Sequence, residues 1–134
     1  MSHDDKPRKR ILVVDDERDV TAFLVEVLQG YGFEALAVNN ALMVVQSAID
    51  FRPDLILLDF DMPYLLGSDV AVLLKKNNSV RSVPIIFLSG MADEEHRIIA
   101  NTAGALAYLE KPVEPADLHE AIQVVFGKDE RDAR

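Results

Sequence analysis

Short hydrophobic runs recur along the chain, separated by stretches with helical spacing. The clearest runs are Ile11–Val14, Leu55–Leu58, Ile85–Leu88 and Ala105–Leu109. Because nearly every position in each run is hydrophobic, we predict strands that are buried on both faces, as in a parallel sheet. A weaker candidate, Phe33–Val38, follows a Gly-Tyr-Gly turn pattern and is predicted to be an edge strand.

Helical patterns fill the intervals between these runs. Hydrophobic residues between Val20 and Leu28 follow the spacing of one helix face, and Gly30 is predicted to end that helix. The other predicted helices are Ala41–Phe51, a helix after Gly67 marked by Val70, Leu73 and Leu74, Asp93–Thr102, and a helix from Pro115 to Gly127. Strand and helix therefore alternate five times, which predicts an α/β fold with a parallel sheet and helices on both faces.

Length and composition narrow this picture. The 134 residues fit one domain, expected at 9–127, with a flexible leader at 1–8 and a charged tail or linker start at 128–134. There is no cysteine, which excludes a disulfide framework and a thiol nucleophile and suits the cytoplasm. A net charge of −9 argues against direct nucleic-acid binding and against an anionic membrane surface. The hydrophobic runs are too short to span a bilayer.

Polar side chains follow the predicted strands at the points where ligands bind in open α/β sheets. The carboxyl ends of parallel strands meet at one edge of the sheet, so these side chains are expected to converge. They are Asp15, Asp16 and Glu17 after the first strand, Asp59 and Asp61 after the third, Ser89 after the fourth and Lys111 after the fifth.

The chemistry of this set indicates phosphoryl transfer. Crowded carboxylates favour a hard divalent cation between them, and magnesium takes one or two carboxylates together with phosphate oxygens. An aspartate can also act as a nucleophile and form an aspartyl phosphate. Lys111 would supply positive charge and Ser89 a hydroxyl donor. Each residue alone also has a structural explanation, such as acids at a helix start or Ser89-Gly90 as a turn.

Four motifs resemble those of CheY-like response-regulator receivers: Val13–Glu17, Leu57–Pro63, Ser89-Gly90 and Tyr108–Pro112. Gly67, Ser89 and Lys111 also stand 8, 30 and 52 residues after Asp59, as in that family. The resemblance covers about residues 9–127. It implies a doubly wound (βα)5 flavodoxin-like fold with a five-stranded parallel sheet of order 2-1-3-4-5.

The resemblance implies that Asp59 is the phosphoacceptor of a signalling switch that does not turn over external substrates. The cofactor would be Mg²⁺ or Mn²⁺, ligated directly by Asp16, Asp59 and the backbone carbonyl of Asp61, while Asp15 acts largely through water. The donor would be a histidine kinase or a phosphotransfer protein.

The resemblance also implies how the switch works. Lys111 would pair with the phosphoryl oxygens, and its peptide bond to Pro112 would be cis. Ser89 would turn toward the phosphoryl group and Tyr108 would move inward. The surface formed by the fourth helix, fifth strand and fifth helix would then change, controlling a partner, an output domain or homodimer formation.

Some positions depart from the family pattern, and two other classes remain open. Ser89 replaces the commoner Thr, Gly90 replaces Ala, position 61 is acidic and Met91 is apolar. In that family, positions 61 and 91 flank the path of the water that hydrolyses the aspartyl phosphate. A phosphatase of the haloacid dehalogenase type also uses an Asp-x-Asp after a strand, although its metal-binding acids follow the lysine. A receiver-like binding module that never accepts phosphate is the other alternative.

Overall fold

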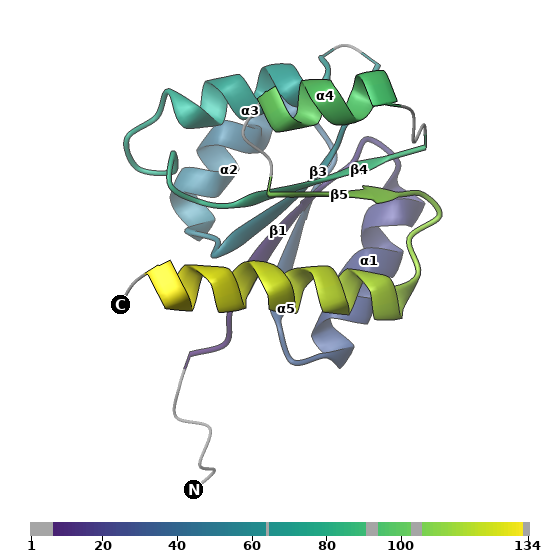
Figure 1. The fold of residues 1–134 in the computed structure, drawn as a ribbon, viewed down its shortest axis with the longest axis vertical. Helices are drawn as coiled ribbons and strands as arrows, with labels where there is room; N and C mark the ends of the chain where they lie inside the picture. Colours follow the sequence, from purple (N-terminus) through teal and green to yellow (C-terminus); the bar gives the residue numbers. More distant parts are fainter. Residues whose placement is uncertain (1–6, 64, 91–93, 103–105, 133–134) are drawn as a thin grey trace, which may run out of the picture.

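The computed structural model describes residues 7–63, 65–90, 94–102 and 106–132, which form alternating strands and helices (Figure 1). The strands are β1 (Arg10–Val14), β2 (Glu34–Val38), β3 (Leu55–Asp59), β4 (Ile85–Ser89) and β5 (Ala107–Glu110). The helices are α1 (Arg18–Gly30), the short 3₁₀ helix η1 (Ala41–Met43), α2 (Val44–Phe51), α3 (Gly67–Lys75), α4 (Glu94–Thr102) and α5 (Pro115–Asp132).

The five strands pair in parallel in the order β2-β1-β3-β4-β5, which confirms the predicted fold class and strand order. β3 lies at the centre, and all five of its residues are buried. β2 lies at one edge with a mostly exposed or partly exposed pattern, as predicted for the weaker run. Because all strands run the same way, their carboxyl ends lie along one edge of the sheet.

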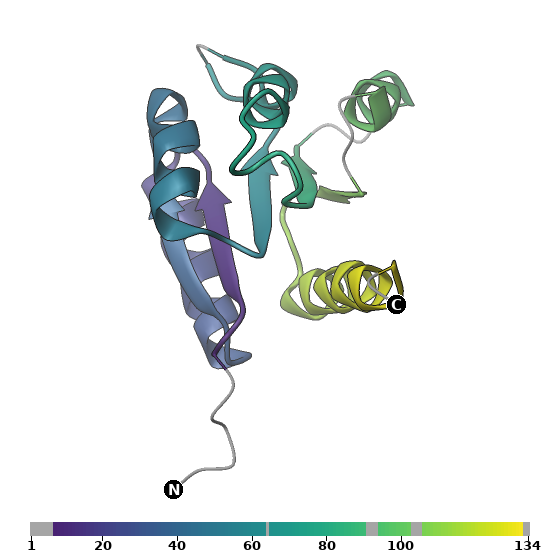
Figure 2. The same cartoon turned by 90° about the vertical axis from the view of Figure 1, so that its left-hand side faces the viewer.

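Alternate residues of each strand enter two separate hydrophobic cores, one on each face of the sheet. Leu12, Val14, Ile56 and Leu58 pack with residues of α2 and α3. Their neighbours along the strands pack with α1 and α5; they include Ile11, Val13, Leu55 and Leu57. Figure 2 shows α5 on the side of the sheet opposite α3 and α4. The near-continuous hydrophobicity of the runs is thus explained by burial on both faces.

Several predicted boundaries differ from the structure. The fifth helix was predicted to end at Gly127, but α5 continues through that residue to Asp132. A single glycine costs a helix only about 1 kcal/mol, which the residues on either side can offset. The predicted helix Ala41–Phe51 is divided into η1 and α2, and the side chain of Asn40 caps the first of them by accepting a hydrogen bond from the backbone N–H of Leu42.

The fifth strand begins later than predicted, at Ala107 in place of Ala105, and extends one residue further to Glu110. Ala105 lies outside the described residues, as do Asp93 and residues 1–6 of the predicted leader. The domain limits 9–127 therefore stay a prediction. Among the helices that the structure describes, none combines the length and the apolar character needed to cross a bilayer.

Candidate functional site

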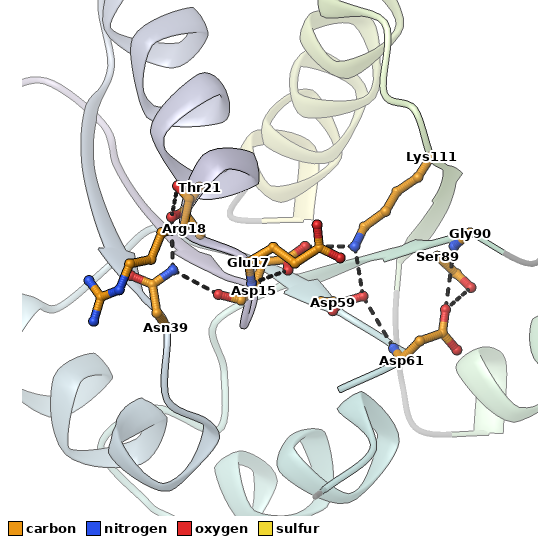
Figure 3. Close-up of polar contacts among 10 residues, drawn as sticks. All are labelled: Asp15, Glu17, Arg18, Thr21, Asn39, Asp59, Asp61, Ser89, Gly90 and Lys111. Atoms are coloured by element: carbon orange, nitrogen blue, oxygen red, sulfur yellow. Dashed lines mark hydrogen bonds and ion pairs between the residues drawn. The ribbon is translucent and has the colours of Figure 1, made fainter. Parts of the chain in front are cut away.

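The polar residues predicted to converge do meet at the carboxyl edge of the sheet (Figure 3). Asp59 and Ser89 are the last residues of β3 and β4, whereas the sequence predicted that each would directly follow its strand. Asp15 follows β1 directly, and Lys111 follows β5. Asp15, Asp59 and Ser89 are each at least 98% buried, although all three are polar. A buried carboxylate is costly without partners, so its contacts are informative.

Lys111 joins two of the buried carboxylates. Its Nζ lies 2.6 Å from Asp15 Oδ2 and 3.1 Å from Asp59 Oδ1, both within hydrogen-bonding distance. We call Asp15, Asp59 and Lys111 the lysine cluster. The cluster connects the ends of β1, β3 and β5, which are far apart in the sequence. A single ammonium is thus placed against two carboxylates, leaving the cluster with a net negative charge.

The electrostatics of the cluster follow from burial and from this imbalance of charge. Burial, and then the negative charge of Asp15, raise the pKa of Asp59 to about 6, against the opposing effects of Lys111 and the Asp61 N–H. Burial alone would lower the pKa of Lys111, but its hydrogen bonds and ion pairs with Asp15 and Asp59 outweigh that effect and raise it. Lys111 therefore stays protonated at neutral pH, whereas the charged form of Asp59 is disfavoured relative to an exposed aspartate.

Asp15, Asp16 and Asp59 form a group that could hold a metal ion. One carboxylate oxygen from each lies within 4.8 Å of the other two. Asp16 is exposed, whereas the other two are buried, so the group opens toward solvent on one side. Three carboxylates facing a single lysine leave uncompensated negative charge, and an all-oxygen donor set suits a hard divalent cation such as Mg²⁺. The donor chemistry of this group therefore fits the predicted metal site.

Asn39, which the sequence prediction did not include, holds the backbone of Asp15 in place and also contacts Thr21. The Asn39 Nδ2 donates hydrogen bonds to the Asp15 backbone carbonyl at 2.8 Å and to Thr21 Oγ1 at 2.9 Å. The Asp15 side chain in turn accepts a hydrogen bond from the Glu17 backbone N–H at 2.9 Å. Asn39 directly follows β2, so its position after a strand was a signal that could have identified it.

The side chain of Asp61 makes contacts that the sequence did not predict. Its Oδ2 accepts a hydrogen bond from Ser89 Oγ at 2.6 Å and another from the Gly90 backbone N–H at 3.3 Å. Its own backbone N–H donates to Asp59 Oδ1 at 3.2 Å. We call Asp61, Ser89 and Gly90 the serine cluster. Figure 3 shows it beside the lysine cluster, joined to it through Asp59.

The remaining predicted features are also present at this edge. The Lys111–Pro112 peptide bond is cis, as the resemblance implied. Tyr108 is partly buried on β5, with its ring 6.5 Å from that of Phe60, between centroids, and with the Arg97 guanidinium 5.8 Å from its ring centroid. Gly67 packs against the turn after β3, because a Cβ there would overlap the backbone carbonyl oxygen of Asp59. This contact explains why a glycine stands eight residues after Asp59, since a larger residue there would overlap the backbone.

A family model of the response regulator receiver domain matches residues 11–123, which are most of the chain. The chain belongs to the response regulator receiver family. Among similar proteins, the DNA-binding response regulator MtrA of Mycobacterium tuberculosis is 34% identical over 114 residues, covering 85% of this chain and 49% of that protein. The phosphate regulon transcriptional regulatory protein PhoB of Pseudomonas aeruginosa is 33% identical, covering 88% of this chain and 52% of that protein.

Solved structures agree with this assignment. A CheY-like response regulator receiver domain protein from Methanospirillum hungatei is 28% identical with a TM-score of 0.86, covering 94% of this chain and 99% of that one. The chain spans about half the length of the curated relatives it matches. Proteins of this family act as signalling switches in two-component systems and are not classic enzymes that turn over external substrates.

Proposed function

We propose that this receiver is a phosphorylation-dependent switch in which Asp59 accepts a phosphoryl group from a histidine kinase or a phosphotransfer protein. The observation that carries the proposal is the position of Asp59. It is a buried carboxylate at the end of the central strand, 3.1 Å from Lys111 and within reach of two further aspartates. A buried acid whose pKa is raised and that lies beside a cation is typical of functional sites.

In the proposed reaction, an Asp59 carboxylate oxygen attacks phosphorus in the phosphohistidine. The P–N bond breaks, and the imidazole nitrogen leaves with the bonding electron pair. Lys111 neutralises negative charge that develops on the oxygens of the transferring phosphoryl group, because its contacts with Asp15 and Asp59 already hold it beside the acceptor. Ser89 would donate a hydrogen bond from its hydroxyl to a phosphoryl oxygen once the aspartyl phosphate has formed.

Asp15, Asp16 and Asp59 would hold Mg²⁺ or Mn²⁺, together with the backbone carbonyl of Asp61. When bound, the metal supplies positive charge for the phosphoryl oxygens. The excess of carboxylates over lysine at this edge supports that assignment. Asp15 has a second role that does not need the metal, since it positions Lys111 through the 2.6 Å contact between Oδ2 and Nζ.

The output of the switch is proposed to be the surface of α4, β5 and α5. Exposed hydrophobic side chains lie on this surface, including Ile98 on α4 and Val124 on α5, which are 57% and 60% exposed. Tyr108 lies on the intervening strand and contacts Phe60, which follows Asp59 directly. A rearrangement at Asp59 and Ser89 could therefore reach this surface, where a partner, an output domain or a second copy would bind. With a net charge of −9, the chain itself is not proposed to bind nucleic acid.

The test is phosphorylation by acetyl phosphate in the presence of Mg²⁺, read by intact-mass spectrometry. Wild type should gain one phosphoryl group, Asp59→Asn should gain none, and EDTA should suppress the reaction in wild type. Asp50→Asn serves as the control, because Asp50 is an exposed aspartate on α2 away from this edge. Equal phosphorylation of wild type and Asp59→Asn would place the acceptor elsewhere and refute the proposal.

The same samples separate the two alternative classes. Sustained hydrolysis of a phosphomonoester such as p-nitrophenyl phosphate would favour the phosphatase reading, which the order of the motifs already disfavours. In that class the metal-binding acids follow the lysine, whereas Asp15 and Asp16 precede Lys111 here. A chain that takes no phosphoryl group from acetyl phosphate or from a phosphotransfer protein would instead be a binding module.

A further inference from the structure

One oxygen of Asp61 binds two donors from the loop that begins at the end of β4. Asp61 Oδ2 accepts from Ser89 Oγ at 2.6 Å and from the Gly90 backbone N–H at 3.3 Å. The first of these distances is typical of a hydroxyl donating to a carboxylate, which is a charge-assisted hydrogen bond. Ser89 is completely buried, whereas Asp61 is exposed. The exposed carboxylate thus reaches inward to the loop.

The same hydroxyl is needed elsewhere in the proposed switch. A serine has a single hydroxyl proton, so Ser89 cannot donate to Asp61 and to a phosphoryl oxygen on Asp59 at the same time. Formation of the phosphorylated arrangement therefore requires the hydrogen bond between Ser89 and Asp61 to break. The Gly90 N–H is bound by the same oxygen, so the Gly90 backbone and the Ser89 hydroxyl would be released together.

We propose that the Asp61 side chain is a positioning residue that holds Ser89 and Gly90 in the unphosphorylated arrangement and so sets how readily the receiver switches. This inference rests on the proposed function, because it assigns Asp61 a place in the same phosphorylation equilibrium. The Asp61 carboxylate is an alternative acceptor for the Ser89 hydroxyl, and the phosphoryl group must compete with it. A receiver with an apolar residue at position 61 would lack that competitor.

The size of the effect follows from a population argument. Affinity for a ligand falls in proportion to the fraction of molecules in the competent arrangement. A hydrogen bond to a charged group is strong enough to change that fraction by about tenfold or more. Removing the Asp61 carboxylate should therefore strengthen binding of a phosphoryl analogue by about tenfold, provided that Ser89 is present to be released.

The experiment measures the binding of beryllium fluoride to the full chain at saturating Mg²⁺, by calorimetry and by amide NMR spectra. Asp61→Ala and Asp61→Asn are each compared in the wild-type background and in the Ser89→Ala background. Asn keeps an acceptor oxygen without the charge, so it separates the hydrogen bond from simple repulsion of the fluoride anion. Asp50→Ala is the matched control, an exposed aspartate on α2 that should change nothing.

We expect Asp61→Ala to tighten binding about tenfold when Ser89 is present and less than about threefold in Ser89→Ala. Asp61→Ala should also shift the Gly90 amide resonance before any fluoride is added, since its N–H loses its acceptor. Asp61→Asn should lie between wild type and Asp61→Ala in the Ser89 background.

If Asp61→Ala raised the affinity for beryllium fluoride equally with and without the Ser89 hydroxyl, Asp61 would act by charge alone and the inference would be overturned. An unchanged Gly90 amide in unliganded Asp61→Ala would overturn it as well. Failure of wild type to bind beryllium fluoride is a different outcome: it would count against the proposed function itself and would remove this inference with it. Binding by wild type without dependence on Ser89 would leave the proposed function standing and refute only the role of Asp61.

Discussion

The lysine cluster and the serine cluster lie side by side at one edge of the sheet, yet they are built differently. Asp15 and Asp59 are buried, and they share the ammonium of Lys111, whose side chain is only 21% exposed. In the serine cluster the acceptor, Asp61, is exposed to solvent, and its partners are a hydroxyl and a backbone N–H. Charge is concentrated in the first cluster, and neutral donors with one accessible carboxylate make up the second.

This difference indicates which part of the edge is fixed and which can move. Breaking the lysine cluster would leave buried carboxylates without a cation, which is costly. Breaking the serine cluster leaves an exposed carboxylate that water can solvate and a buried but uncharged hydroxyl, so its opening costs less. We therefore expect the lysine cluster to dominate stability and the serine cluster to control the choice between conformations. The substitutions below compare the two clusters directly, beginning with the largest expected effect.

Lys111→Met should destabilise the protein far more than Asp61→Ala. Without the ammonium, Asp15 and Asp59 are two buried carboxylates with no counter-ion, and the free energy of unfolding should fall by about 3–5 kcal/mol in EDTA at neutral pH. Asp61→Ala should lower it by about 1–1.5 kcal/mol, because the buried Ser89 hydroxyl loses this acceptor. Urea unfolding measures both values. Lys76→Met is the control for loss of a lysine, because Lys76 is the exposed C-cap residue of α3. Equal losses for Lys111→Met and Asp61→Ala would remove the distinction between the clusters.

The pH dependence of stability should isolate Asp59. Its pKa in the folded protein is about 6, above the ordinary value of 3.8. Because the folded state holds the proton more tightly, the associated stability is fully present below about pH 3.8 and is lost as pH rises through about 6. Wild type should therefore lose about 2 kcal/mol relative to Asp59→Asn between pH 4 and pH 7 in EDTA.

The measurement is urea unfolding of both variants at each pH, and only their difference is interpreted, so that the titration of other groups cancels. Asp50→Asn should show no such change with pH relative to wild type. Addition of Mg²⁺ at pH 7 should restore wild type more than Asp59→Asn, since the metal offsets the charge that the variant lacks. A difference that is constant from pH 4 to pH 7 would contradict the electrostatic account of the lysine cluster.

The lysine cluster could be predicted from sequence because topology alone brings its members together. Parallel strands place every residue that follows a strand at the same edge, so the positions of Asp15, Asp59 and Lys111 after hydrophobic runs were sufficient. Which carboxylate oxygen each donor chooses depends on side-chain rotamers and on the loops. Neither follows from strand order, so the contact between Asp61 and Ser89 was not predicted.

Helix boundaries were harder to predict for a different reason. The hydrophobic pattern predicts that the helix ends at Gly127, but a glycine ends a helix only where the chain turns away, and α5 continues past it. The cap by Asn40 at the start of η1 is a local hydrogen bond, and a hydrophobic pattern carries no information about it. The fold was predictable where hydrophobic burial decides the structure, and less so where single hydrogen bonds decide it.

Two glycines allow a comparison of the backbone beside each cluster. A Cβ at Gly67 would overlap the backbone of Asp59 and Phe60, whose turn sets the direction of the acceptor carboxylate, whereas a Cβ at Gly90 would meet nothing within 4 Å. Gly67→Ala should therefore destabilise the protein by about 1–3 kcal/mol and slow phosphorylation by acetyl phosphate. Gly90→Ala should change stability by about 0.5 kcal/mol or less. Thermal unfolding monitored by circular dichroism checks both, and a larger loss in Gly90→Ala would show that the serine cluster is the more rigid of the two.

Only a modest loss of stability is expected from Ser89→Ala, although Ser89 is completely buried. The substitution removes one hydroxyl, and the partner that it leaves, Asp61, is exposed and can be solvated by water. Stability should therefore fall by about 1–1.5 kcal/mol, toward the lower end of the cost of deleting a hydrogen bond to a charged group. Urea unfolding in EDTA gives the value, and Ser89→Thr tests whether the site tolerates added volume. A loss as large as that of Lys111→Met would mean that the hydroxyl holds the sheet edge together, and the serine cluster could not then be the part that moves.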